Sequence, residues 1–134
     1  MRRLLLCLLA SGLPIVCSSA PPDSGNKAVQ SERWATPVKH DANLYRIDDK
    51  LYRSEQPVAE DGEAIVKLGI QSVINLRFFD RNDDDHLKAH GLTLLNRPLL
   101  SWSIKPKEIT EILYLFEKQQ QNGAVLIHCY HGAD

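Results

Sequence analysis

The final nine residues, LIHCYHGAD, contain the side chains best suited to nucleophilic chemistry. A strand-like apolar run leads into a His–Cys pair, and a glycine follows three residues after the cysteine. A cysteine attacks only as its thiolate, which positive surroundings must stabilise. A loop of consecutive backbone N–H groups provides such a field and also binds phosphate oxygens. Gly132 permits the tight curl of that loop, so the pattern favours a working Cys129 over a small buried residue at a strand end.

The strands that would position Cys129 are predicted from short apolar runs. NLYRID and KLYRS alternate apolar and polar residues on either side of a polar turn, which predicts a hairpin. SVINLR, LTLLNRP and AVLIHC are runs of the kind buried in a parallel sheet, with AVLIH expected near its centre.

Helices are predicted between these strands. Helical spacing of apolar residues predicts helices at about 58–68 and 106–121. The acidic stretch NDDDHLKAHG, which closes on Gly91, predicts another. The alternation predicts an α/β domain with a mainly parallel central sheet flanked by helices. Sites in such sheets lie beyond the carboxyl ends of the strands, where Cys129 falls.

The first 40 residues have a different composition from the rest. Residues 1–20 place two arginines before an apolar stretch and small residues, the pattern of a secretory signal peptide. The alternative is a lipoprotein signal acylated on Cys17. Either predicts an exported protein, periplasmic or held at the membrane as a lipoprotein through Cys17. Residues 21–40 mix Pro, Gly, Ser and charge, which predicts a linker before a domain at 41–134.

Composition excludes several other classes of function. The chain has 134 residues, and its formal net charge of -1 without a basic run gives no indication of a nucleic-acid partner. Three cysteines are too few for a disulfide framework, and no Cys/His spacing predicts a metal site. No cofactor is expected.

The segment HCYHGAD resembles the start of the HCx5R phosphate-binding loop of cysteine-dependent phosphatases. It is most similar to the atypical dual-specificity group of bacteria, plants and fungi, whose loop commonly reads HCxHGADRTG. LYRSEQP and LGIQSVINLR match the same group, so the resemblance covers about residues 40–134. It implies that Cys129 is the nucleophile and that His128 orients the loop and keeps the thiol ionised. The phosphate would be held by Tyr130, His131, Gly132, Ala133 and Asp134.

Two features depart from the family's pattern. The family's arginine would be residue 135, after the last residue of this sequence, so we expect this 134-residue fragment, truncated before that arginine, to be inactive. Glu55 stands where the family commonly has glycine, which places the geometry after that strand in question.

The general acid is not apparent from the sequence. Related phosphatases carry an Asp about thirty residues before the cysteine, but NRPLLSWSIKPKE has none, and Glu108 is expected in the first turn of a helix. The resemblance favours Asp134, because some phosphoinositide phosphatases with a related loop carry a candidate general acid at the position just before the arginine. The acidic cluster at 80–85 is another candidate, although a solvated helix N-terminus is the simpler interpretation. Arg77 and Arg97 could add phosphate affinity, but ordinary solvated arginines are the simpler interpretation. Trp102 could line a substrate mouth, although simple packing is an equally good interpretation.

Three functions fit these features. A phosphatase acting through a phosphocysteine is preferred. The alternatives are a non-catalytic phosphate-binding module and a rhodanese-like sulfurtransferase, which also places a cysteine in a strand-to-helix loop. A phosphorylated protein, a phosphoinositide and an inositol phosphate all fit a loop that contacts mainly the phosphoryl group.

Overall fold

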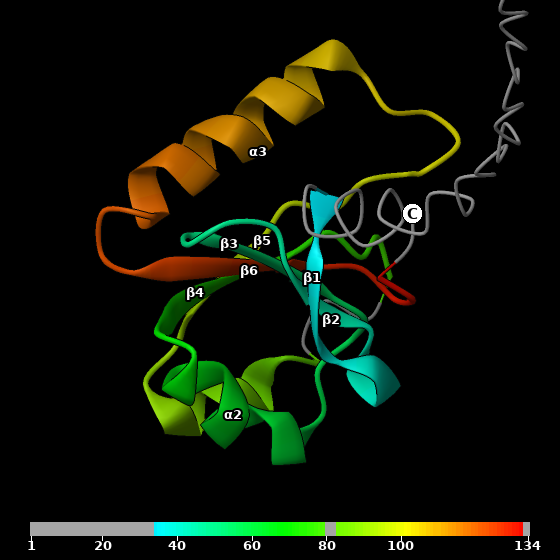
Figure 1. Cartoon of the computed structure of the whole chain (residues 1–134). Helices are drawn as coiled ribbons and strands as arrows, with labels where there is room; N and C mark the ends of the chain where they lie inside the picture. Colours follow the sequence, from blue (N-terminus) through cyan, green and yellow to red (C-terminus); the bar gives the residue numbers. More distant parts are fainter. Residues whose placement is uncertain (1–33, 80–82, 133–134) are drawn as a thin grey trace, which may run out of the picture.

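The protein is built on a mixed sheet of six strands in the order β1-β2-β3-β6-β4-β5 (Figure 1). The computed structural model describes residues 34–79 and 83–132. The pairs β3–β6, β6–β4 and β4–β5 are parallel, whereas β1–β2 and β2–β3 are antiparallel. The strands are β1 (Thr36–Lys39), β2 (Leu44–Arg46), β3 (Leu51–Ser54), β4 (Ile70–Asn75), β5 (Thr93–Asn96) and β6 (Ala124–His128).

Helices lie on both faces of this sheet (Figure 1). Helix α3 covers one face, and α2 lies with the 3-10 helix η3 on the other. The α/β architecture predicted from the sequence is thereby confirmed. The helical elements are η1 (His40–Ala42), η2 (Ala59–Asp61), α2 (Gly62–Lys67), η3 (Asp85–His90) and α3 (Pro106–Gln119), where η denotes a 3-10 helix.

The predicted hairpin is present as β2 and β3. The Asp48 carboxylate accepts hydrogen bonds from the backbone N–H of Lys50 at 2.7 Å and of Leu51 at 2.8 Å, which closes the turn. The sheet begins earlier than the sequence indicated, because Thr36–Lys39, within the expected linker at 21–40, pairs with β2. Three of these four residues are exposed, so no apolar alternation marks the strand.

The strand that carries the His–Cys pair lies between β3 and β4. His128 at the end of β6 is in register with Ser54 on one side and Asn75 on the other. Ala124, Val125 and Leu126 are buried, as expected for an apolar run with neighbours on both sides. The carboxyl ends of β3, β6, β4 and β5 therefore meet at one edge of the sheet.

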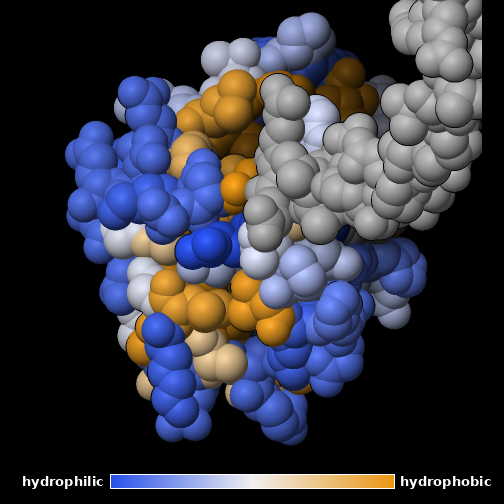
Figure 2. Space-filling view, viewed as in Figure 1, coloured by the Kyte–Doolittle hydropathy of each residue, from blue (hydrophilic) through white to orange (hydrophobic). Residues whose placement is uncertain are grey.

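The two faces of the sheet are packed by different residues. The α2 and η3 side holds a core cluster that includes Ile65, Leu87 and Leu126. On the other side, Ile112 is the buried residue of α3. Hydrophobic residues also reach the surface near α3, in the upper part of Figure 2. Within residues 34–79 and 83–132, no helix is both long and apolar enough to cross a bilayer.

The helix predicted after the acidic stretch is short and of the 3-10 type. Element η3 spans Asp85–His90 and ends at Gly91, whose φ of 77° lies in the left-handed region, as predicted for a C-terminal glycine. Asp84 precedes the helix without capping it. Its carboxylate has partners elsewhere, namely Gln56 and His128.

Candidate active site

Cys129 lies just past the end of β6, at the shared carboxyl edge of the parallel strands. It is partly buried and forms no disulfide in the described part of the chain. The sheet pairing continues up to it, because the N–H of Leu76 donates to the carbonyl of His128 at 2.9 Å. The sulfur is thus held at the end of a rigid strand while remaining accessible.

The backbone carbonyls after His128 are bound by groups outside the turn. The carbonyl of Cys129 lies 3.1 Å from Nδ1 of His128. The carbonyl of Tyr130 accepts from the N–H of Gln56 at 3.2 Å. Both contacts turn the carbonyl oxygens back toward the body of the protein.

The next two carbonyls are bound by side chains from the hairpin side of the sheet. The carbonyl of His131 accepts from Nδ2 of Asn43 at 2.7 Å, and that of Gly132 accepts from Nη1 of Arg53. The guanidinium of Arg53 also lies over the ring of Tyr45, 4.3 Å from its centre, which fixes its orientation.

These carbonyl contacts determine where the loop's N–H groups point. In a trans peptide the C=O and the following N–H point in opposite directions. The N–H groups of Tyr130, His131 and Gly132 are therefore turned away from the body of the protein. In agreement, the N–H of Gly132 donates to Sγ of Cys129 at 3.1 Å. Consecutive N–H groups that face one side in this way can bind an anion.

Gly132 is required here for two reasons. Its φ of 71° is left-handed, where a side chain is disfavoured. A Cβ at this position would also lie 2.5 Å from the backbone N of Glu55 and 2.6 Å from the carbonyl carbon of Ser54. The loop thus packs directly on the backbone after β3. Glu55 occupies this contact through its main chain, and its N–H donates to the carbonyl of Ala42 at 3.3 Å.

A buried polar network lies beneath the loop. Nε2 of His128 is 3.0 Å from Oδ2 of Asp84, and both side chains are almost fully buried. Oδ1 of Asp84 accepts from Nε2 of Gln56 at 2.6 Å. Burial alone raises the pKa of Asp84, but hydrogen bonds from His128 and Gln56 and the charge of His128 outweigh it, so the pKa lies below its ordinary 3.8.

The interpretation of Asp84 as part of a solvated helix start is therefore wrong. Asp83 and Asp85 are closer to that expectation: Asp83 pairs with Arg77 at 2.6 Å and Asp85 with Lys88 at 2.7 Å, both with half-exposed side chains. Asp80 lies outside the described residues.

Arg77 is likewise not an ordinary solvated arginine. Its side chain is only 8% exposed. Nη1 donates to Oε1 of Gln56 at 2.8 Å as well as to Asp83, and the guanidinium lies over the ring of Tyr130, 4.9 Å from its centre. Arg97, in contrast, is exposed and donates to the carbonyl of Asn96.

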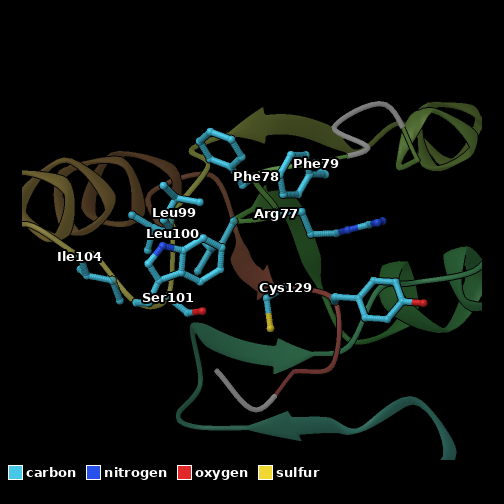
Figure 3. Close-up of a pocket in the computed structure, with 11 residues that line it drawn as sticks. Arg77, Phe78, Phe79, Leu99, Leu100, Ser101, Ile104 and Cys129 are labelled. Atoms are coloured by element: carbon cyan, nitrogen blue, oxygen red, sulfur yellow. The ribbon is translucent and has the colours of Figure 1, made fainter.

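A pocket of about 390 Å³ opens beside Cys129 (Figure 3). Its walls come from the segment after β4, the loop between β5 and α3, and the start of the cysteine loop. Arg77 and Cys129 border the pocket, and Trp102 lines it with 77% exposure. The remaining lining is mostly apolar or aromatic: Leu76, Phe78, Phe79, Leu99, Leu100, Ser101, Ile104 and Tyr130.

The candidates for a general acid are not brought to the sulfur by described contacts. Glu108 lies in the first turn of α3, as predicted, and caps it by accepting from the N–H of Lys105 at 2.7 Å. Ala133 and Asp134 lie outside the described residues. Among the residues that the structure describes, no group of three or more His, Cys, Asp or Glu could hold a metal ion.

Four residues support the loop or the network beneath it without having been predicted to do so: Asn43, Arg53, Gln56 and Asp84. Gln56 and Arg53 belong to LYRSEQP, whose match to the family was the available signal. Asn43 has a φ of 45°, which marks a turn that brings its side chain to the loop. Nothing in the local sequence distinguishes Asp84 from its acidic neighbours.

The sheet, its flanking helices and the cysteine loop have the fold of tyrosine and dual-specificity phosphatases. The crystal structure of TpbA from Pseudomonas aeruginosa matches with a TM-score of 0.70 and 29% identity, over 77% of this chain and 63% of that one. A crystal structure of TpbA in complex with pTyr matches with a TM-score of 0.72 and 28% identity, over 78% and 64% of the two chains.

Sequence comparison finds the same relative. This chain is homologous to the dual specificity protein phosphatase TpbA of P. aeruginosa strain PAO1, with 30% identity over 105 residues. It is 28% identical over 129 residues to TpbA of strain UCBPP-PA14. These matches cover 78% and 96% of this chain but 47% and 58% of the relatives, so the chain spans about half their length. No protein family model matches it.

Proposed function

We propose that this chain is a member of the cysteine-dependent, dual-specificity phosphatases and that Cys129 is its nucleophile. The observation that carries the proposal is the cradle: outside groups bind the loop carbonyls, and the N–H of Gly132 donates to Sγ of Cys129. N–H groups around the sulfur favour the thiolate and can hold the phosphoryl oxygens. Homology to TpbA gives independent support.

The reaction follows from this arrangement. The Cys129 thiolate attacks phosphorus, an S–P bond forms, and the P–O bond to the leaving group breaks. The leaving oxygen takes a proton, for which Asp134 is the proposed donor. Water then attacks the phosphocysteine, which releases inorganic phosphate and restores the thiolate. The N–H groups of the loop, with Ala133 and Asp134 included in the proposal, stabilise the charge on the phosphoryl oxygens in both steps.

The substrate that best fits the pocket is an aryl phosphate such as phosphotyrosine. Aromatic and aliphatic side chains form most of the wall beside Cys129 and suit an uncharged ring. Arg77 is the one cationic side chain among the described lining residues, whereas a phosphorylated inositol carries several charges. The complex of TpbA with pTyr agrees with this choice.

The arginine of the family's loop also enters the proposal. The resemblance places it directly after Asp134, at a position that is not among these 134 residues. Such an arginine binds two phosphoryl oxygens at once and stabilises the transition state. We therefore expect the 134-residue chain to turn over little by itself.

The test compares the 134-residue chain with a version extended by the Arg-Thr-Gly helix of a close relative, using p-nitrophenyl phosphate, phosphotyrosine and phosphoserine. We expect at least about 100-fold higher activity in the extended version. Aryl phosphates should be preferred over phosphoserine. Cys129→Ser in the extended version should abolish turnover because it removes the nucleophile.

Three outcomes would contradict parts of the proposal. Equal activity of the two versions would show that the arginine is unnecessary. Turnover in Cys129→Ser would exclude the phosphocysteine mechanism. Phosphate or vanadate binding without any hydrolysis by the extended version would favour the non-catalytic phosphate-binding module instead.

A further inference from the structure

The pocket beside Cys129 is larger than one aromatic ring needs. Its volume is about 390 Å³. An apolar cavity of about 150 Å³ is enough to hold benzene. In the proposed function the N–H groups of the cysteine loop hold the phosphoryl group, so the ring is the part of a phosphotyrosine that enters the pocket. A single ring therefore leaves more than half of this space open.

One side of the pocket is formed by the loop between β5 and α3. Figure 3 shows Ile104 of this loop on one side of Cys129 and Arg77 on the other. The residues that the loop contributes to the lining are uncharged: Leu99, Leu100, Ser101, Trp102 and Ile104. This side of the pocket therefore suits an apolar group, because a second charged group would lose water there without gaining a partner.

Backbone hydrogen bonds hold the loop that carries these side chains. The N–H of Leu99 donates to the carbonyl of Leu76, just after β4, at 2.9 Å. The N–H of Ser103 donates to the carbonyl of Leu100 at 2.8 Å, which closes a turn within the loop. The apolar side of the pocket is thus formed before any ligand binds, so a ligand need not order the loop.

We propose that this loop forms an apolar subsite, centred on Trp102 and Ile104, for an apolar side chain next to the phosphotyrosine of a protein substrate. Trp102 is 77% and Ile104 46% exposed, so a ligand that covers them removes apolar surface from water. Cys129 borders the same pocket, which makes a residue close in sequence to the phosphotyrosine the nearest source of that side chain. The subsite rests on the proposed function, because Cys129 fixes the position of the ring.

The test measures the dissociation constants of labelled phosphotyrosine peptides by fluorescence anisotropy. The peptides are identical except for leucine at the two positions before the phosphotyrosine, leucine at the two positions after it, or serine at all of these positions. They are titrated with the 134-residue chain and with its extended version, both carrying Cys129→Ser to prevent turnover. We expect one of the leucine peptides to bind about tenfold more tightly than the serine peptide, because it buries a leucine side chain.

A pair of isoleucine substitutions assigns this preference to the loop. Ile104→Ser makes the subsite smaller and polar, so the preference for the leucine peptide should fall to about twofold or less. Ile109→Ser is the matched control, because Ile109 has a similar exposure of 42% but lies on α3 and does not line the pocket. It should keep the tenfold preference. The ratio of the two dissociation constants is the readout, since partial unfolding would weaken the binding of both peptides alike.

Three results would overturn the subsite. Equal binding of the leucine and serine peptides would exclude it and leave phosphotyrosine recognition intact. Failure of every phosphotyrosine peptide to bind the extended version would contradict the proposed function itself, and the subsite with it. Dimerisation of the chain in sedimentation experiments, abolished by Ile104→Ser but not by Ile109→Ser, would assign the apolar surface to a second copy of the chain instead.

Discussion

The α2 and η3 side of the sheet and the α3 side differ in how completely their apolar residues are covered. Ile65 and Leu87 are 2% and 0% exposed and belong to the main core cluster. On α3, Leu113 and Tyr114 are 60% and 63% exposed. The apolar pocket beside Cys129 opens next to the segment that leads into α3. The cysteine loop is therefore supported from the packed side of the sheet, while the pocket beside Cys129 lies toward the less covered side.

The largest expected difference in stability would come from truncating a leucine to alanine on each side of the sheet. Leu87→Ala should lower the free energy of unfolding by about 2 to 5 kcal/mol because it leaves a cavity in a closed core. Leu113→Ala should change it by no more than about 0.5 kcal/mol because the side chain is mostly in water. Urea unfolding of both variants measures the difference. Equal losses of unfolding free energy would mean that α3 is covered in solution, so that the two sides of the sheet do not differ.

Two left-handed glycines test how tightly the loop is packed. Gly91→Ala should cost about 1 to 2 kcal/mol of stability from backbone conformation alone, because no atom lies within 4 Å of its Cβ position. Gly132→Ala has the same conformational cost and also meets the backbone of Ser54 and Glu55. We expect Gly132→Ala to lose more stability than Gly91→Ala and to show slower alkylation of Cys129. Both variants are measured under the same conditions. An alkylation rate like that of Gly91→Ala would show that the loop is not held as described.

The smallest expected effect is the dependence of stability on acid. Because the pKa of Asp84 is lower in the folded state than its ordinary 3.8, Asp84 stabilises the fold above that pH. This contribution is lost as the pH falls through the folded-state value. The unfolding free energy of the native chain should therefore decrease more between about pH 6 and about pH 3 than that of Asp84→Asn. Asp85→Asn, as control, should keep the steeper native dependence.

The sequence was informative where one periodicity or one residue type determines the structure. The apolar run AVLIH predicted a central strand because both of its neighbours bury it, and Gly91 predicted a helix end through its positive φ. Strand β1 could not be predicted, since an exposed edge strand has no apolar pattern. Asp84 was misread because local sequence cannot tell which carboxylate of an acidic run will meet a histidine 44 residues away.

In the candidate site, too, local sequence predicts some residues and distant contacts determine the others. Cys129, His128 and Gly132 could be proposed as site residues from the sequence, because they are close together in the chain. The residues that hold the loop carbonyls come from other elements, so their roles depend on topology: Asn43 lies 88 residues from its partner and Arg53 lies 79. The pocket walls likewise come from three separate segments.

The position of β6 between β3 and β4 has a consequence for synthesis on the ribosome. Strands β3 and β4 follow each other in the chain but do not pair, because β6 lies between them. Until residues 124–128 emerge, β1-β2-β3 and β4-β5 are separate sheets, each with an open edge that invites pairing with other chains. Emergence of β6 joins these two parts of the described sheet and delivers Cys129 in the same step, so the long-range pairings of β6 should limit the rate at which they fold together.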